Sequence, residues 1–477
     1  MTGHGTMNEK RAGNMKTKNT KGAGAAATAS REAGRAVRPS AKGAAASRRP
    51  AAEGARAGGA LTPAMLAHAS AVLGELLTFS QPADGVLSGY FREHRQLGGR
   101  ERAFIAETCY QVLRHKRQLE RLVQPAHGAR WLVLAALLRH AGLAQKQLAE
   151  VVSVTEREWL QALKSGPEPV WLLAERLDFP DWLVARLADR FSEAALIELA
   201  QGLNGSAPLD VRVNTLKATR EDVLARLAAE GLPAEASPHA SCGIRFKGKP
   251  ALQKHTLFLE GAIEVQDEGS QLLGVLLAPK RGEMVVDFCA GAGGKTLLLG
   301  AMMRSTGRLY AFDVSAKRLA RLKPRVARSG LSNVHPVCID SEGDVRIKRL
   351  AGKIDRVLVD APCSGLGTLR RNPDLKWRQT PQAIAELVQK QGGILASAAR
   401  LVKPGGRLVY ATCSILEEEN GQIVEAFMAA HPQFRRLNAQ EVLVAQGIII
   451  DCGEDMRLLP HVHGTDGFYA AVLERAA

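Results

Sequence analysis

Residues 285–296 read VVDFCAGAGGKT, and this stretch decides the fold. A short apolar strand ends at Asp287, a glycine-rich turn follows, and a helix begins near Lys295. Glycines in such a turn let the backbone approach a ligand closely. The spacing is not that of a phosphate-binding loop, because Cys289 occupies the position of that loop's first glycine. We therefore predict a turn that binds a nucleoside without phosphates.

Strands and helices alternate on the C-terminal side of this turn. Strands are predicted at 284–288, 308–312, 335–339, 355–360 and 407–412, and helices at 315–329 and 381–401. Thr380 is the expected N-cap of the last helix, with Pro381 at its first position. The alternation predicts an α/β fold with a doubly wound, mostly parallel sheet. Ligands of such sheets bind beyond the carboxyl ends of the strands.

Acidic residues end two further strands of the predicted sheet. Asp313 lies 19 residues beyond Gly294, where a carboxylate can accept hydrogen bonds from both hydroxyls of a ribose. Asp340 ends the next strand and can accept a hydrogen bond from the amino group of an adenine. With Asp287 leading the loop, S-adenosylmethionine is the nucleoside that fits. The alternative is a tight turn with helix-capping acids, and agreement among three strand ends favours the cofactor site.

Two later strand ends each carry a cysteine, in the sequences DAPCSG at 360–365 and TCS at 412–414. Neighbouring parallel strands deliver both thiols, Cys363 and Cys413, to the same crevice. A thiol beside a methyl donor has a chemical use. Addition of a thiolate to C6 of a pyrimidine makes C5 nucleophilic enough to take a methyl group, after which the thiol is eliminated. A carboxylic acid such as Asp360 can stabilise charge on the ring.

These motifs resemble those of the RNA cytosine-5 methyltransferases of the Sun/Nop type. Residues 208–214, 265–271 and 466–469 are similar to that family's connector and C-terminal strand motifs. Residues 97–119 resemble the NusB-like RNA-binding domain of the bacterial small-subunit ribosomal RNA methyltransferase B subgroup. The resemblance implies a Rossmann-like class I methyltransferase domain, S-adenosyl-L-methionine as cofactor and methylation of C5 of a cytosine in RNA, with small-subunit ribosomal RNA as the expected substrate.

The resemblance also implies roles for individual residues. Cys413 attacks C6, Cys363 assists product release, and Asp360 supports both the chemistry and the cofactor. The remaining cofactor-binding residues implied are Cys289, Ala290, Gly291, Ala292, Gly293, Gly294, Lys295, Asp313 and Asp340. One departure is visible, because the family's loop reads Ala-Pro where this chain has Gly291 and Ala292. Losing the proline loosens the loop.

Composition divides the chain of 477 residues, which has a formal charge of +16. Residues 1–60 hold 12 Lys/Arg against 3 Glu, a net of +9, and no aromatic residue, which predicts a disordered basic tail; this composition is also similar to an organellar transit peptide. The remaining 417 residues carry 16 − 9 = +7. We expect an all-α NusB-like RNA-binding domain at 61–204, an α+β connector at 205–275 and the methyltransferase domain at 276–477.

Other features bear on location and partners. No run approaches ~18 apolar residues, so no membrane segment is expected, and seven cysteines without a C-x-x-C pair predict a reducing, cytoplasmic setting with no metal site. We expect a monomer. The basic run at 370–377 is predicted to contact RNA through phosphates and Trp377. Arg212 and Asn214 either touch RNA or brace the connector against the catalytic domain.

Two other functions stay open at this point. One is a DNA cytosine-C5 methyltransferase, in which the Pro-Cys cysteine, Cys363, is the nucleophile. The other is a non-catalytic RNA-binding assembly factor with a degenerate methyltransferase fold. Both thiols and the cofactor acids are intact, which favours an enzyme.

Overall fold

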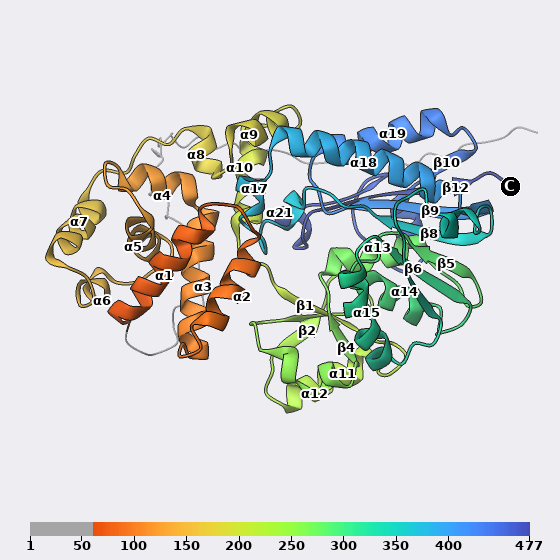
Figure 1. The fold of residues 1–477 in the computed structure, drawn as a ribbon, viewed down its shortest axis with the longest axis horizontal. Helices are drawn as coiled ribbons and strands as arrows, with labels where there is room; N and C mark the ends of the chain where they lie inside the picture. Colours follow the sequence, from red (N-terminus) through yellow and green to blue (C-terminus); the bar gives the residue numbers. More distant parts are fainter. Residues whose placement is uncertain (1–60) are drawn as a thin grey trace, which may run out of the picture. The chain divides into compact units, whose positions relative to one another are not determined.

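The computed structural model describes residues 61–477, and the predicted basic tail, residues 1–60, lies outside the described residues. Residues 61–204 form helices (Figure 1) with two hydrophobic cores, one around Leu66 and Leu134 and another around Phe179. The second core also contains Leu366 and Ile384, so the last of these helices pack on the C-terminal part of the chain. The helices are α1 (Pro63–Leu76), α2 (Ala83–Glu93), α3 (Gly99–Arg114), α4 (Lys116–Val123), α5 (Ala129–Arg139), α6 (Gln145–Ala149), α7 (Val154–Ser165), α8 (Leu173–Leu177), α9 (Asp181–Ala188) and α10 (Glu193–Asn204).

A small antiparallel sheet with strand order β2-β3-β1-β4 follows these helices. Its elements are β1 (Leu209–Val213), α11 (Arg220–Ala229), β2 (Ala234–Ala236), β3 (Gly243–Phe246), α12 (Thr256–Leu259) and β4 (Ile263–Val265). Its four strands are short, with three to five residues each.

The predicted doubly wound sheet is confirmed as an eight-stranded sheet with strand order β10-β12-β9-β8-β5-β6-β7, with β11 paired to β12. The five strands from β9 to β7 are parallel, and β12 runs antiparallel to β9. The strands are β5 (Met284–Asp287), β6 (Arg308–Asp313), β7 (Val334–Cys338), β8 (Ile354–Asp360), β9 (Val402–Thr412), β10 (Phe434–Leu437), β11 (Met456–Leu458) and β12 (Phe468–Arg475).

Helices cover both faces of this sheet because its central strands are apolar on both sides. In β8, Val357 and Val359 enter one core with α16, α18 and α19, whereas Leu358 enters the other with α13 and α20. The helices of this region are α13 (Glu268–Leu277), α14 (Gly294–Met302), α15 (Ala316–Ser329), α16 (Val345–Lys348), α17 (Leu375–Arg378), α18 (Pro381–Ala399), α19 (Gly421–Ala430), α20 (Ala439–Val444) and α21 (Pro460–His463). The expected N-cap of α18 is confirmed, since the Thr380 hydroxyl accepts the N–H of Ala383.

The basic run at 370–377 was expected to contact RNA, and this prediction is wrong for its principal side chains. Arg370 is buried and pairs with Asp466, with 2.9 Å between Nη2 and Oδ1. Lys376 is fully buried, and Trp377 donates its indole N–H to the carbonyl of Leu113 at 2.7 Å. The run joins the C-terminal part of the chain to α3, and packing removes the side chains of Arg370 and Lys376 from solvent.

None of the helices between residues 61 and 477 combines the length and apolar composition that crossing a bilayer requires.

The burial of Lys376 makes stability depend on pH. Burial lowers the pKa of Lys376 to about 7 from 10.5, while its ammonium donates to the carbonyl of Arg114 at 2.8 Å. The unfolded chain keeps the ordinary value, so unfolding takes up a proton between these two pH values. The free energy of unfolding should therefore rise with pH there, by up to about 1.4 kcal/mol per unit. Urea unfolding from about pH 7 to about pH 9 should show that Lys376→Met loses this rise.

The matched control is Lys390→Met, which removes an exposed lysine from α18. It should keep the slope of the unmodified chain. Equal slopes in all three proteins would contradict the prediction.

Candidate functional site

The topology places the loops that follow the five parallel strands at one edge of the large sheet. The chain runs from β5 outward to β7 and then returns to form β8 on the other side of β5, so the strand order reverses between β5 and β8. Ligands of open α/β sheets bind at such a reversal, beyond the carboxyl ends of the strands. Asp287 lies beside Leu358 and Asp360 beside Ala411 in the parallel register. The glycine-rich loop and both cysteine loops therefore begin side by side.

The two cysteines predicted to share a crevice are in contact. Sγ of Cys363 lies 3.3 Å from Sγ of Cys413. The pKa of Cys363 lies well above its ordinary value because its thiol hydrogen-bonds to Cys413, is buried, and faces the negative charges of Cys413 and Glu419. A neighbouring negative charge disfavours ionisation of a thiol, so these surroundings favour a protonated Cys363.

A carboxylate that the sequence analysis missed joins the two cysteine loops. Glu419 is fully buried and accepts hydrogen bonds from the hydroxyls of Ser364 and Ser414, the residues that follow the two cysteines. It also accepts the N–H of Ser364 at 2.8 Å and the side-chain amide of Gln391 at 3.0 Å. The run of three glutamates at 417–419 is the only signal in the sequence, and it does not tell which one turns inward.

The glycine-rich loop is held in a left-handed turn. Gly293 has φ +86°, and a Cβ there would lie 2.1 Å from Cδ1 of Leu322. Gly291 has φ +57°, so the residue that replaces the family's alanine adopts a conformation that glycine favours. The N–H of Gly291 donates a hydrogen bond to Oδ2 of Asp313 at 2.9 Å. The carbonyl of Ala292 accepts a hydrogen bond from Nη1 of Arg325 at 2.6 Å. Asp313 therefore fixes the loop from below.

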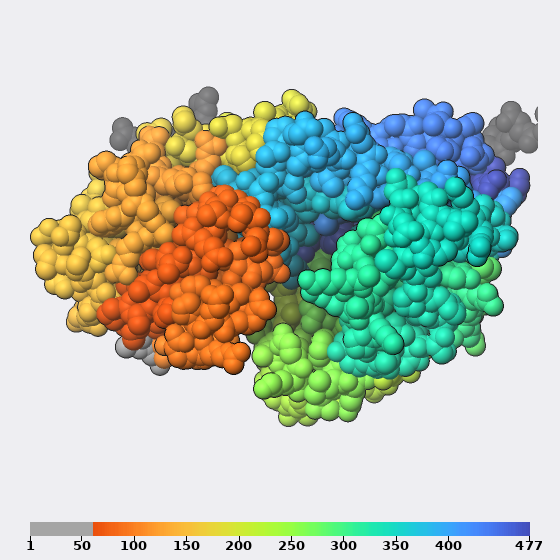
Figure 2. Space-filling model, viewed as in Figure 1, coloured from red at the N-terminus to blue at the C-terminus, as the bar shows by residue number. Residues whose placement is uncertain are grey.

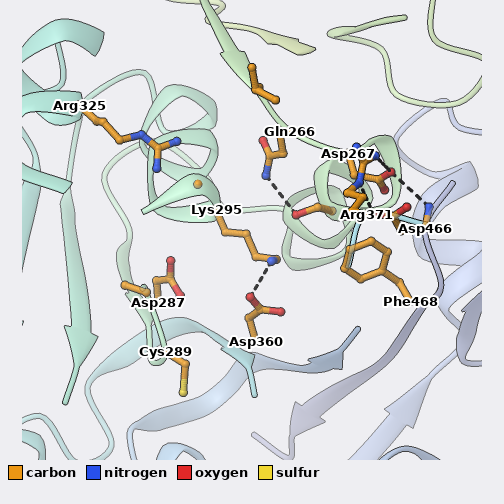
Figure 3. A pocket seen from close by; sticks show the side chains of 14 residues that line it. Gln266, Asp267, Asp287, Cys289, Lys295, Arg325, Asp360, Arg371, Asp466 and Phe468 are labelled. Atoms are coloured by element: carbon orange, nitrogen blue, oxygen red, sulfur yellow. Dashed lines mark hydrogen bonds and ion pairs between the residues drawn. The ribbon is translucent and has the colours of Figure 1, made fainter. Parts of the chain in front are cut away.

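A cavity of about 390 Å³ opens beside this loop (Figure 3). Lys295 reaches into it and donates to Asp360, with 2.6 Å between Nζ and Oδ2. Burial would lower the pKa of Lys295, but attraction to Asp360 and their hydrogen bond outweigh it, so that pKa is raised. A charged pair thus faces the cavity where the sequence suggested a lone carboxylic acid. The cavity is lined by Val265, Gln266, Asp267, Ser270, Asp287, Cys289, Ala290, Gly294, Lys295, Arg325, Asp360, Arg371, Asp466 and Phe468.

Not every predicted cofactor residue lines this cavity. Cys289, Ala290, Gly294, Lys295 and Asp360 do. Gly291, Ala292 and Gly293 form the turn beside the cavity, and Asp313 is buried next to this turn. The side chain of Asp340 faces solvent, is 93% exposed and pairs with Arg346 at 3.4 Å. Burial raises the pKa of the Cys289 thiol far above its ordinary value, which disfavours a reactive thiolate there.

Asp287 is a buried acid in the wall of this cavity. Burial raises the pKa of Asp287 to about 7, although the hydroxyl of Thr296 donates to it. Oδ1 of Asp287 is buried without a hydrogen-bond partner within residues 61–477. An unpartnered carboxylate oxygen in the wall suits a ligand that brings a donor or a positive charge. A cationic nucleoside such as S-adenosylmethionine therefore fits these residues.

The opposite wall comes from the motifs at 265–271 and 466–469 and from Arg371 of the 370–377 run, none of which was predicted to line the cofactor site. Arg371 bridges Asp267 and Asp466, at 2.9 Å and 2.6 Å (Figure 3). Burial and the nearby charge of Asp466 raise the pKa of Asp267 to about 6. Phe468 adds an aromatic face, with its ring centroid 6.0 Å from Nζ of Lys295.

Arg212 and Asn214 brace the connector. Arg212 is buried and donates to Oε1 of Gln266 at 2.7 Å. The Asn214 amide donates to the carbonyls of Gly261 and Ser329, at 3.0 Å and 2.9 Å. Of the two alternatives drawn from the sequence, these contacts fit bracing.

Comparison with known proteins shows the family. A family model described as 16S rRNA methyltransferase RsmB/F matches residues 274–474, and the ferredoxin-like domain model of RsmF/B-like methyltransferases matches residues 179–253. The chain is 34% identical over 413 residues to a probable ribosomal RNA small subunit methyltransferase B of Synechocystis sp., covering 79% of this chain and 92% of that one. It is 32% identical to the Bacillus subtilis protein of the same name, covering 72% and 76%.

Solved structures agree with this assignment. The crystal structure of PH0851 has a TM-score of 0.71 and 28% identity, covering 87% of this chain and 99% of that one. A methyltransferase homologue from Pyrococcus horikoshii has a TM-score of 0.55 and 30% identity, covering 64% and 97%. The chain belongs to the RsmB/F family of methyltransferases, as its motifs predicted.

Proposed function

We propose that this methyltransferase transfers a methyl group to C5 of a cytosine in RNA through a covalent bond between a cysteine and C6. The observation that carries the proposal is the contact between Cys363 and Cys413 at the ends of β8 and β9, beside a cavity that contains a Lys295–Asp360 pair. A methyltransferase that acted on a strong nucleophile would need no thiol. A pyrimidine carbon needs a thiol to make it nucleophilic, and a second group to assist release of the methylated product from that thiol.

S-adenosyl-L-methionine is the methyl donor of this family, and it supplies an electrophilic methyl group on a positively charged sulfur. We propose that residues 289–295 and Asp360 hold it, with Asp287 facing its positive charge. Asp313 supports this site by fixing the turn through Gly291. Asp340 is exposed, so its proposed contact to an adenine needs the loop after β7 to fold inward.

The chain's own residues divide the proposed chemistry between them. Cys413, as thiolate, forms the bond from Sγ to C6 while the C5–C6 π electrons move into the ring, where the ammonium of Lys295 faces the developing negative charge. C5 then takes the methyl group from the donor's sulfonium, which leaves as a neutral thioether. A base removes the C5 proton, and the electrons of that bond re-form the C5–C6 double bond as the C6–Sγ bond breaks. Cys413 leaves as a thiolate, which the Cys363 thiol can protonate. The raised pKa of Cys363 keeps its thiol protonated, which suits a group that assists elimination rather than one that attacks.

Small-subunit ribosomal RNA is the proposed substrate, because the relatives in Synechocystis and Bacillus carry that substrate in their names. We propose that residues 61–204 form the NusB-like RNA-binding domain and residues 205–275 the connector. Helix α2 and its C-terminal loop support this with exposed Arg92 and Arg95 beside Tyr90, whose ring stacks on His94 at 4.0 Å. Basic and aromatic side chains together are typical of surfaces that bind single-stranded RNA.

Substituting each cysteine tests the assignment of roles. Cys413→Ala should reduce methylation of RNA to background, because Cys363, the other thiol in the crevice, has a raised pKa and stays protonated. Cys363→Ala should slow release and accumulate a covalent protein–RNA complex that survives denaturing electrophoresis. Incorporation of a radioactive methyl group and gel mobility measure the two effects. Cys109→Ala, at a buried thiol in the helices, is the control and should behave like the unmodified protein.

The opposite pattern would contradict this assignment. Activity retained in Cys413→Ala and lost in Cys363→Ala, with DNA as the methylated substrate, would favour a DNA cytosine-C5 enzyme. Binding of S-adenosylmethionine without methylation of any RNA would favour a non-catalytic assembly factor.

The hydrogen bonds of Glu419 predict a second kinetic effect. Glu419→Gln replaces an acceptor oxygen by an amide donor, so the two serine loops lose part of their shared anchor. The thiols then move apart, and a displacement near 1 Å costs up to about 100-fold in rate. We expect kcat to fall by about 10- to 100-fold with KM for RNA little changed. The matched control is Glu418→Gln, whose carboxylate pairs with Arg186 instead. Equal kcat values in the two variants would contradict a positioning role for Glu419.

Mapping of methylated cytosines tests the substrate. Bisulfite sequencing of small-subunit ribosomal RNA should show a 5-methylcytosine that disappears when the protein is absent and returns with the unmodified chain but not with Cys413→Ala. Identical maps with and without the protein would contradict the proposed function.

A further inference from the structure

Helix α15 carries an unusual distribution of charge. It has six basic residues and no acidic one within Ala316–Ser329. Leu319 and Leu322 are its buried side, and they pack against Ala290 and Leu297. Four basic residues at spacings of four, four and three follow the opposite side, as residues that share one helical face do: Lys317, Arg321, Arg325 and Arg328. We call these four residues the α15 stripe.

The stripe is only partly neutralised. Arg325 and Arg328 share the carboxylate of Glu264, with 3.0 Å between Nη2 of Arg325 and Oε2. Lys317 and Arg321 are exposed, and within residues 61–477 no carboxylate forms an ion pair with either of them. One carboxylate against four cations leaves a net positive surface along the helix.

This arrangement costs helix stability. Lys317 lies in the first turn, where the helix dipole disfavours a cation, and the first turn contains no acid. Like charges four residues apart repel each other, as Lys317 does Arg321 and Arg321 does Arg325. Unfavourable local interactions of this kind, with no compensating contact, are expected at functional sites.

The stripe leads to the candidate site. Arg325 lines the cavity and donates to the carbonyl of Ala292 in the glycine-rich loop. The surface is hollowed between the orange helices and the teal part of the large-sheet region in Figure 2, and α15 lies at the teal border of that hollow (Figure 1). A polyanion that reaches the cavity can therefore lie along α15.

We propose that the α15 stripe binds the phosphate backbone of the RNA strand that enters the cavity, with Lys317 and Arg321 as its free phosphate contacts. The proposal rests on the proposed function for the identity of the polyanion. It places an RNA contact in the methyltransferase region itself. This contact is separate from any that the helices at 61–204, the connector or the 370–377 run make. Contacts of this kind add affinity without reading sequence, and they weaken with salt as counterions are released.

The test is the double variant Lys317→Gln/Arg321→Gln in the full chain. The probe is a fluorescently labelled single-stranded RNA, and binding is measured by anisotropy from about 50 to about 200 mM salt. We expect affinity to fall about tenfold, and the slope of log affinity against log salt to decrease by about 1.4, since each lost contact to a single strand removes about 0.7. In methylation assays KM for RNA should rise and kcat should hold. The midpoint of thermal unfolding should hold or rise, because repulsion within α15 is relieved.

The matched control is Lys348→Gln/Lys390→Gln, which removes the same charge from exposed lysines of α16 and α18, helices that cover the other face of the sheet. It should leave the salt slope unchanged. Equal slopes in the two double variants would overturn the inference. RNA binding through α15 without formation of methylcytosine would overturn the proposed function and support this inference, so the two failures are distinguishable.

Discussion

The buried carboxylate of Glu419 holds together the two loops on which the site depends. A charged group without solvent is tolerated only when its acceptor capacity is used, and here two serine hydroxyls, one backbone N–H and one amide use it. These donors come from the loops after β8 and β9 and from α18. One side chain, bonded to the residues that follow both cysteines, therefore holds the two thiols at their separation.

The segment after Cys363 extends this constraint outward. Arg370 and Arg371 pair with Asp466, and Arg371 also pairs with Asp267 in the cavity wall. A few residues later, Lys376 and Trp377 donate hydrogen bonds to the last carbonyls of α3. One short stretch thus links the cavity to the helices at 61–204. The side chains that look like a nucleic-acid contact in sequence are used for internal packing.

The net charge of the chain likewise does not show where a polyanion binds. Of the formal +16, residues 1–60 contribute +9, and many arginines of the described part are paired within the molecule. Lys317 and Arg321 differ because they are exposed and lie on the helix that supports the glycine-rich loop. A net charge indicates a polyanionic partner, but only the unpaired cations on one surface indicate where that partner binds.

The sequence by itself determined the parallel sheet, because β-branched strands alternating with helices and glycine turns have few other ways to bury both faces. It also determined that both cysteines meet, since parallel neighbours present their carboxyl ends at one edge. Tertiary structure alone decided that Glu419 rather than Glu417 or Glu418 turns inward, that Asp340 faces solvent, and that Trp377 packs on α3. These outcomes depend on contacts between segments far apart in the chain, and local periodicity carries no record of such contacts.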